Sequence, residues 1–233
     1  MLSARMRLLA ILLASGGGVM GDGCGPERPV TQEPQDEVRL PEPRTSGTVS
    51  VEEAIHDRRS VRDFRGDPLD LAMVSQLLWA TQGITDGNGL RSVPSAGATY
   101  PLEIRLIAGA VEGLSPGVYR YRPHRHSLDL VESGDRRRAV AGAALDQRWI
   151  ADAPVTIVVA GVFHRTTGRY GERGRQYVHM EVGHASQNVY LQAVALGLGT
   201  TVVGAFRDGE LTTAAGLEGQ EDPLALLPVG VPR

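Results

Sequence analysis

The sequence predicts an α+β fold, because helical and strand-like apolar patterns occur together in a chain of ordinary globular composition. Apolar residues recur at helical spacing in several windows, while other segments alternate in polarity as half-buried strands do. Residues 154–162 form a continuous apolar, β-branched run, which is typical of a strand buried at the centre of a sheet. With 233 residues and 42% apolar side chains, the chain is long enough for one such domain and some additional chain.

The charge and cysteine content exclude several classes of protein. The formal net charge is -3, so the chain has no basic excess that would indicate a nucleic-acid partner. Cys24 is the single cysteine, which excludes both a disulfide framework and a CxxC-type zinc site within one chain. A cofactor must therefore be held by other side chains.

Residues 1–24 have the layout of a secretory signal or lipoprotein-like segment. Arg5 and Arg7 precede an apolar run at 8–13 that is too short to span a bilayer durably. Cys24 follows where a bacterial lipoprotein carries its acylated residue, although Asp22 departs from the small and apolar residues usual there. We expect an exported chain, with a lipid anchor at Cys24 as one form of export. The alternative is a cytoplasmic protein whose start codon has been placed too far upstream.

Residues 25–49 are predicted to be a disordered linker, because five prolines and few apolar side chains occur within 25–48. The folded domain is expected at 50–233. Its first helix begins at Ser50, which forms a capping-box pattern with Glu53, and ends close to Arg58. Amphipathic spacing predicts further helices at 70–82, 136–145 and 176–196, the first of them stopped by Gly83 and the last by 197–199. Alternating or continuous apolar runs predict strands at 102–106, 118–122, 154–162, 200–204 and 224–231.

The common nucleotide-binding motifs are absent, since the chain has no GxGxxG after a strand, no Walker loop and no HExxH on a helix. Three other segments suit flavin mononucleotide (FMN), which combines a phosphate, a polyhydroxyl chain and a flat redox-active ring. In the first segment, Arg58, Arg59, Ser60 and Arg62 offer guanidinium forks and a hydroxyl just past a helix end. By itself this segment also fits a solvated helix end.

The other two segments provide close backbone approach and a second cation. Small residues at 94–101 let the backbone approach a planar ligand, and the alternative is an ordinary tight loop. Gly204 and Ala205 can lie near the ring, with Arg233 as a cationic chain end near the phosphate. The alternative for this third segment is a pair of edge strands.

In combination and order, the motifs of this chain resemble the nitroreductase family, and more closely its SagB/ThcOx-type branch of azoline dehydrogenases. The motifs are Arg-Arg-Ser-x-Arg-x-Phe (58–64), Pro-Ser-Ala-Gly-x-x-Tyr-Pro-x-Glu (94–103), Gly-His-x-x-Gln-Asn (183–188), Gly-Leu-Gly (197–199) and Leu-Pro-Val-Gly-x-Pro (227–232). The resemblance covers about 51–233. It implies an α/β sandwich around a central mixed sheet, flanked by helices, and a homodimer with FMN at the subunit interface.

The resemblance also implies roles for individual residues. The phosphate would be held by Arg58, Ser60 and Arg233, with Arg59 reaching the ribityl chain or ring and Arg62 a neighbour. The ring would be lined by Pro94, Ser95, Ala96 and Gly97 across the dimer interface, with Gly204 and Ala205 at its reactive edge and Gln147 as a further contact. The expected chemistry is hydride transfer at flavin N5.

Three functions are compatible with these residues. The first is NAD(P)H-dependent reduction of nitro, quinone or similar small acceptors. The second is dehydrogenation of azoline or peptide-derived substrates, although Arg169-Tyr170 stands where that branch tends to have Lys-Tyr, and an arginine is a poor general base. Tyr170 can still exchange a proton, so Tyr170 and Arg169 are the catalytic candidates. The third is a non-catalytic flavin-binding protein.

A metal site is not predicted. Glu181 and His184 are three residues apart on the long helix, but His179 falls well round the helix from His184, so this segment makes no three-ligand site. We expect His184, Gln187 and Asn188 to be polar groups at a dimer or cofactor boundary.

Overall fold

The computed structural model describes residues 37–233, which belong to the unit Pro34–Arg233. The strands are β1 (Glu37–Arg39), β2 (Leu102–Ala108), β3 (Gly117–Arg122), β4 (Ser127–Ser133), β5 (Val155–Gly161), β6 (Gly199–Thr200) and β7 (Asp222–Gly230). The helices are α1 (Val51–Asp57), α2 (Leu71–Gln82), α3 (Arg137–Ala143), α4 (Trp149–Asp152), α5 (Phe163–Tyr170), α6 (Arg173–Ala195) and α7 (Asp208–Ala214), with a short 3₁₀ helix, η1 (Ala96–Ala98). The predicted signal segment with Cys24, and residues 25–36 of the predicted linker, lie outside the described residues.

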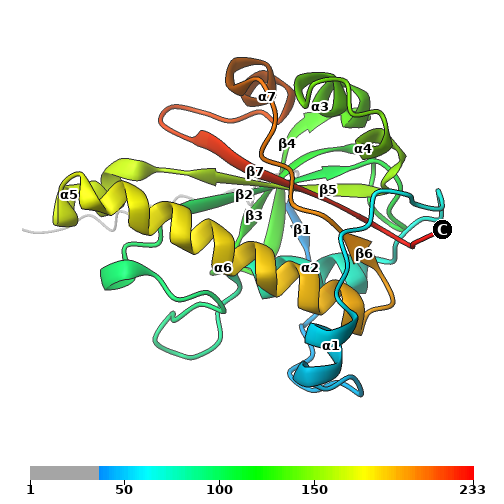
Figure 1. Ribbon diagram of the computed structural model, residues 1–233, viewed down its shortest axis with the longest axis horizontal. Helices are drawn as coiled ribbons and strands as arrows, with labels where there is room; N and C mark the ends of the chain where they lie inside the picture. Colours follow the sequence, from blue (N-terminus) through cyan, green and yellow to red (C-terminus); the bar gives the residue numbers. More distant parts are fainter. Residues whose placement is uncertain (1–36) are drawn as a thin grey trace, which may run out of the picture. The chain divides into compact units, whose positions relative to one another are not determined.

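The strands form one sheet in the order β1-β4-β3-β2-β5-β7-β6, and their pairings are antiparallel (Figure 1). The predicted central strand is confirmed, because β5 pairs with β2 on one side and β7 on the other and is buried throughout. Parallel pairing in the described part of the chain is limited to isolated bridges such as Ser60 with Thr200. The α+β class is therefore confirmed. The sheet was expected to combine parallel and antiparallel pairing, and its parallel pairing is confined to these bridges.

Helices cover both faces of the sheet, because alternate side chains of the inner strands enter two separate hydrophobic cores. In β5, Ile157 and Val159 belong to the core shared with α2 and α6, whereas Val158 and Ala160 belong to the core shared with α3 and α7. Figure 1 shows the long α6 and α2 on one side of the sheet and α3, α4 and α7 on the other. No helix within residues 37–233 has both the length and the apolar character needed to cross a membrane.

Local signals set the helix ends as predicted. The Ser50 hydroxyl accepts a hydrogen bond from the Glu53 N–H at 3.0 Å, and α1 begins at the next residue. Asp70 caps α2 in the same way through the N–H of Met73, and Gly83 ends that helix. These caps depend on residues three positions apart, which is why the sequence alone indicates them.

The interpretation of residues 37–48 as part of a disordered linker is wrong. Glu37–Arg39 forms β1, which pairs with β4, and Leu40 is buried in the core that α2 lines. The side-chain amide of Gln76 on α2 binds the backbone of Arg44, since its Oε1 accepts from the Arg44 N–H at 2.8 Å and its Nε2 donates to the Arg44 carbonyl at 3.0 Å. The prolines of this segment do not prevent its ordering, because it gains a strand partner and a helix contact from residues far along the chain.

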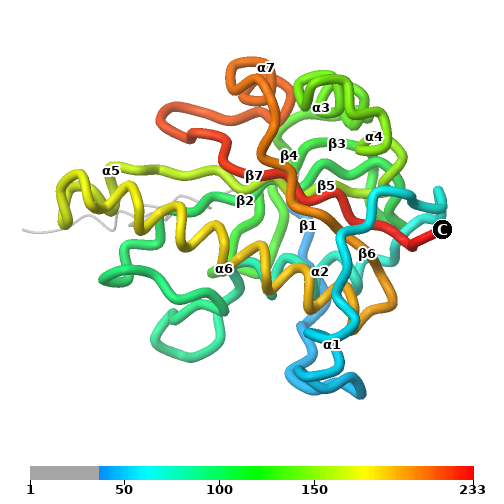
Figure 2. Tube along the Cα trace, viewed as in Figure 1, coloured from blue at the N-terminus to red at the C-terminus, as the bar shows by residue number. Residues whose placement is uncertain are grey.

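The chain end runs along the arginine segment, as Figure 2 shows where the C-terminal trace meets the segment after α1. Phe64 forms a β-bridge with Pro232, and the N–H of Arg65 donates to the carbonyl of Val231 at 2.9 Å. The strand expected at 200–204 is shorter than predicted, because regular pairing stops at Thr200 and only Val203 bridges to β7 beyond it. Helix α5, which carries Arg169 and Tyr170, was not indicated by the apolar pattern.

Candidate cofactor-binding site

The arginine segment meets α6 through Tyr190. The N–H of Arg58 closes α1 by donating to the carbonyl of Ala54 at 3.0 Å. Its guanidinium carbon lies 5.1 Å from the centroid of the Tyr190 ring, and Ser60 Oγ lies 3.2 Å from Tyr190 Oη. The structure thus brings Arg58 and Ser60, two of the three expected phosphate contacts, to one aromatic side chain.

Tyr190 connects this segment to the chain after β6. Its hydroxyl accepts a hydrogen bond from the Val202 N–H at 2.9 Å and lies 3.3 Å from Thr201 Oγ1. Burial favours the neutral phenol, but the hydrogen bonds with Ser60 and Thr201, the hydrogen bond from the Val202 N–H and the nearby Arg58 cation outweigh it, so the pKa of Tyr190 is lowered. Sequence patterns did not single out Tyr190, because a tyrosine in a long helix is more often a packing residue.

The remaining cations of the segment have different surroundings. Arg59 donates from Nη1 to the carbonyls of His56 and Arg58 at 2.7 and 2.8 Å. It lines a cavity of about 280 Å³ whose walls include Tyr190 and Thr200. Arg233 is exposed and pairs with Asp63, Nε to Oδ1, at 3.1 Å, while Arg62 is exposed as well. The structure therefore places Arg233 beside Asp63, next to the arginine segment, and not on Arg58 or Ser60.

The loop expected to line the ring is held by α6 at a second position. Glu181 is 3% exposed, and its Oε1 accepts hydrogen bonds from the Ala96 N–H at 2.9 Å and from Ser95 Oγ at 3.1 Å. Burial raises the pKa of the Glu181 carboxyl, although these two hydrogen bonds act in the opposite direction. Pro94 and Gly97 are exposed at the loop surface. In the sequence, Glu181 drew notice only through its spacing from His184, which did not suffice for a metal site, and no local pattern indicated its contact with the loop.

The predicted catalytic pair lies against the same loop. Arg169 donates from Nη1 to the carbonyl of Gly97 at 3.0 Å. A Cβ added to Gly97 would lie 2.5 Å from Tyr170 Oη and 2.7 Å from Arg169 Nη1, and Gly97 has a φ of 60°, so a side chain here would be strained and would displace both groups. The structure therefore brings Arg169, Tyr170 and the 94–97 loop together, as a shared role at a flavin ring requires.

The third predicted group also assembles in part. Gln147 donates from Nε2 to the carbonyl of Ala205 at 3.3 Å and to that of Ala144 at 2.9 Å. Gly204 and Ala205 are exposed, and a Cβ built on Gly204 would meet no atom within 4 Å. This stretch of backbone is therefore open to a ligand, and Gln147 fixes its position.

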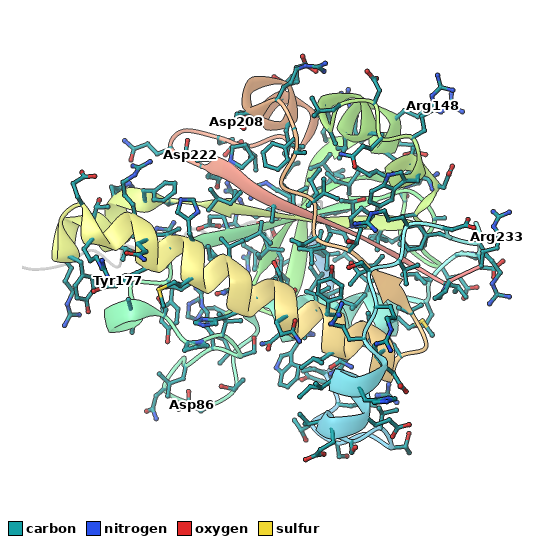
Figure 3. All side chains as sticks on the ribbon, in the orientation of Figure 1. Asp86, Arg148, Tyr177, Asp208, Asp222 and Arg233 are labelled. Atoms are coloured by element: carbon teal, nitrogen blue, oxygen red, sulfur yellow. The ribbon has the colours of Figure 1, made fainter. Side chains whose placement is uncertain are left out.

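The two ends of the candidate site contact different sides of α6. Glu181 and Tyr190 are nine residues apart, which corresponds to about 13.5 Å along the helix and about half a turn around it. Figure 3 shows Tyr177 near the start of α6 and Arg233 on the opposite side of the view. Tyr170 belongs to the first of these ends, because its ring lies 5.3 Å from that of Tyr177. Within one chain, Glu181 and Tyr190 therefore lie on opposite sides of α6.

The histidines of α6 do not gather around Glu181. His179 packs against the Phe163 ring at 5.4 Å, and His184 is exposed. Among residues 37–233, no three His, Cys, Asp or Glu side chains form a group that could hold a metal ion. Gln187 is exposed as a boundary residue would be, whereas Asn188 donates to the carbonyls of Ala80 and Ser92 inside the chain.

The sheet with helices on both faces is the nitroreductase fold. A crystal structure of a Ralstonia eutropha protein described as a "putative nitroreductase" superposes with a TM-score of 0.73 at 27% identity, over 88% of this chain and 94% of that one. The Nitroreductase family model matches residues 55–231, and the chain belongs to this family.

Relatives by sequence extend this assignment. The chain is 47% identical over 194 residues to "Putative nitroreductase MJ1384" of Methanocaldococcus jannaschii, covering 83% of this chain and 96% of that protein. It is 27% identical over 139 residues to the microcin B17-processing protein McbC of Escherichia coli, covering 57% of this chain and 50% of McbC. The resemblance to the SagB/ThcOx-type branch is confirmed by relatives of this second kind.

Proposed function

We propose that this protein is an FMN-dependent oxidoreductase that reduces small acceptors with electrons from NAD(P)H. The observation that carries the proposal is the pairing of two groups on α6, a cationic hydroxyl-rich group at Tyr190 and a tightly held small-residue loop at Glu181. Membership of the nitroreductase family supports an oxidoreductase, and the chemistry of the two groups supports a flavin as its cofactor.

The group around Tyr190 suits the phosphate of FMN. Among the described residues, Arg58 has no carboxylate within ion-pair distance, so its charge is available to an anion. The Ser60 hydroxyl and the exposed Arg62 add a donor and a cation nearby. The Arg233 guanidinium would have to leave Asp63 before it could contact the phosphate, which makes it the weakest of the predicted contacts.

The loop at 94–97 suits the ring, and the chain's own residues there would orient it. When bound, FMN supplies two-electron transfer at N5 between donor and acceptor. Because Gly97 has no side chain, Tyr170 can approach the loop backbone closely. A Cβ at Gly204 would meet no atom within 4 Å, so the backbone there leaves room for a ring edge. Tyr170, with its hydroxyl beside Gly97, is placed to hold or exchange a proton at this end of the site.

A complete site requires two copies of the chain. The exposed face of α6, which includes Met180, Gly183, His184 and Gln187, lies between the directions of Glu181 and Tyr190. A second copy seated on this face would bring the loop of one copy toward the arginine segment of the other. We therefore propose a homodimer in which each flavin contacts both copies.

Anaerobic reduction tests the proposed function. The purified protein should bind FMN, NADH or NADPH should bleach the flavin absorbance, and a quinone or nitroaromatic acceptor should restore it. Failure to bind FMN would overturn the proposal as a whole. Bound flavin that neither donor reduces would remove the reductase and leave a non-catalytic flavoprotein or a dehydrogenase.

A dehydrogenase of azoline or peptide-derived substrates is the second candidate, and the position of Arg169 and Tyr170 against the loop favours it. The similarity to McbC, named as a microcin B17-processing protein, also supports this second candidate. A guanidinium is a poor general base, so Tyr170 would have to act as the base. Arg169→Lys should raise azoline oxidation if a lysine base at this position matters, and an unchanged rate on azoline substrates would show that the departure from Lys-Tyr is irrelevant.

A further inference from the structure

Glu181 is a carboxylate in an unusual position, because burying an ionisable group costs free energy unless it is well paired. Its Oε1 accepts two hydrogen bonds from the loop, while Oε2 is buried without a hydrogen-bond partner among the described residues. His184 and Arg91 are the charged groups that act on it from nearby. Neither forms an ion pair with it within residues 37–233, so its specific partners are the two loop donors.

The loop that Glu181 holds has a strained backbone. Gly97, Ala98 and Tyr100 have φ values of 60°, 53° and 44°, and the last two residues carry side chains that rarely adopt this region. For Ala98 and Tyr100 this conformation is unfavourable and persists only where surrounding contacts impose it. The loop therefore needs an external anchor to keep its shape.

Hydrogen bonds accepted by Glu181 and by Ser95 span the strained stretch. Ser95 Oγ donates to Glu181 and accepts from the Tyr100 N–H at 2.9 Å, so the first and last residues of the turn are joined to the carboxylate. Ala96 contributes its own N–H. Two turns further along α6, Asn188 donates to the carbonyls of Ala80 and Ser92, which fixes the chain entering the loop.

We propose that Glu181 is a positioning residue that holds the 94–100 loop in the strained shape needed to line the flavin ring. The proposal rests on the proposed function, because it takes that loop as the ring-binding segment. It concerns the ring end alone: Glu181 lies about half a turn and about 13.5 Å from Tyr190, so it has no contact with the phosphate-type group.

The test compares riboflavin with FMN, since the two share the ring and differ in the phosphate. Glu181→Ala should lower the affinity for both flavins by the same factor, about tenfold or more, as expected for the loss of two hydrogen bonds to a charged group. Glu181→Gln keeps the side-chain volume and one acceptor oxygen, so it should retain affinity within about threefold. Glu172→Gln, the same change at the exposed start of α6, is the matched control and should bind like the wild type.

Hydrogen exchange of the loop amides gives a readout that needs no flavin. In Glu181→Ala the amides of Ala96 and Tyr100 should exchange at least about tenfold faster, and Glu181→Gln should restore most of the protection. Should Glu181→Ala fail to fold, Ser95→Ala removes the hydroxyl that joins Glu181 to the Tyr100 N–H and leaves the carboxylate in place. The Tyr100 amide should then exchange faster, and wild-type exchange would overturn the anchor.

The outcomes separate the two proposals. Unchanged flavin affinity in Glu181→Ala overturns the positioning role, even if the loop amides exchange faster. A factor that differs between FMN and riboflavin also overturns it, because the effect would then lie at the phosphate. If the wild type binds neither flavin, the proposed function fails, and the exchange data alone decide whether Glu181 anchors the loop.

Discussion

Tyr190 and Glu181 show how single side chains of one helix organise segments that are distant in sequence. Tyr190 joins Ser60 to the chain at 201–202, and Glu181 joins the loop at Ser95 and Ala96. Both use buried polar atoms whose hydrogen bonds are made to backbone or hydroxyl groups, which fixes the position of the partner segment. The functional side chains around them are therefore positioned by α6 and not by their own elements.

Removing the Arg58 charge should weaken only the binding of the FMN phosphate. We expect Arg58→Ala to weaken FMN binding by about tenfold or more, because a hydrogen bond to an ionised group contributes about 1.5–3 kcal/mol. Riboflavin affinity should stay near the wild-type value. Fluorescence titration of both flavins measures the two effects, with Arg138→Ala on the exposed start of α3 as the control for net charge. Equal FMN affinity in the two variants would refute the anchor.

The raised pKa of Glu181 predicts a pH dependence of stability. Burial makes the folded protein take up this proton at a higher pH than the unfolded chain, whose value is near 4.5. The free energy of unfolding should therefore increase, relative to Glu181→Gln, as pH falls from the folded pKa toward 4.5, and this gain should vanish above the folded pKa. Urea unfolding between pH 4.5 and 8 measures the difference, which should be absent when Glu172→Gln is compared with the wild type.

At the scale of elements, β1 and the segment after it complete one edge of the domain. β1 extends the sheet beyond β4, and Leu40 then enters the core beside α2. The opposite edge carries β6, next to the arginine segment. Each edge of the sheet is thus closed by a short strand with little pattern of its own, and both strands depend on longer neighbours for their hydrogen bonds.

Truncating Leu40 tests whether this segment belongs to the folded domain. Leu40 is 7% exposed, so Leu40→Ala should lower the free energy of unfolding by about 2–4 kcal/mol, as for other buried leucines. Leu90 is 53% exposed, and Leu90→Ala should change the free energy of unfolding by less than about 1 kcal/mol. Urea denaturation of both variants gives the comparison. Similar stabilities of the two variants would indicate that residues 37–48 are a linker and not part of the folded domain.

At the scale of the whole molecule, the sheet and its two helical layers hold α6 with one face exposed. That face separates the Tyr190 end from the Glu181 end by about half a turn. In the proposed site, each chain contributes two half-sites, and the proposed homodimer would combine the four into two complete sites.

Mixing two variants tests this arrangement. Copies carrying Arg58→Ala and copies carrying Glu181→Ala each lack one half-site, but a mixed dimer would hold one complete site and one doubly defective site. Random exchange should therefore restore about a quarter of the wild-type flavin sites, because half of the dimers are mixed. Flavin content after co-refolding measures the recovery, and each variant refolded alone is the control. No recovery, despite mixed dimers in solution, would show that each site lies within one chain.

Local patterns in the sequence determined most of the elements. The caps at Ser50 and Asp70, the stop at Gly83 and the buried run of β5 depend on near neighbours, so each was predicted within a few residues. The arginine segment, the 94–97 loop and the Arg169-Tyr170 pair were also identified, because their residue types and order resemble those of the nitroreductase family.

Only the tertiary structure decided how these parts meet. Ser60 and Tyr190 are 130 residues apart, and Ala96 and Glu181 are 85 apart, so no local pattern connects them. The ordering of β1 and the pairing of Arg233 with Asp63 likewise depend on partners distant in the chain or in space. Side-chain hydrogen bonds and burial between remote segments are formed only when the chain has folded, and for that reason Glu181 and Tyr190 emerge as candidate site residues only in the structure.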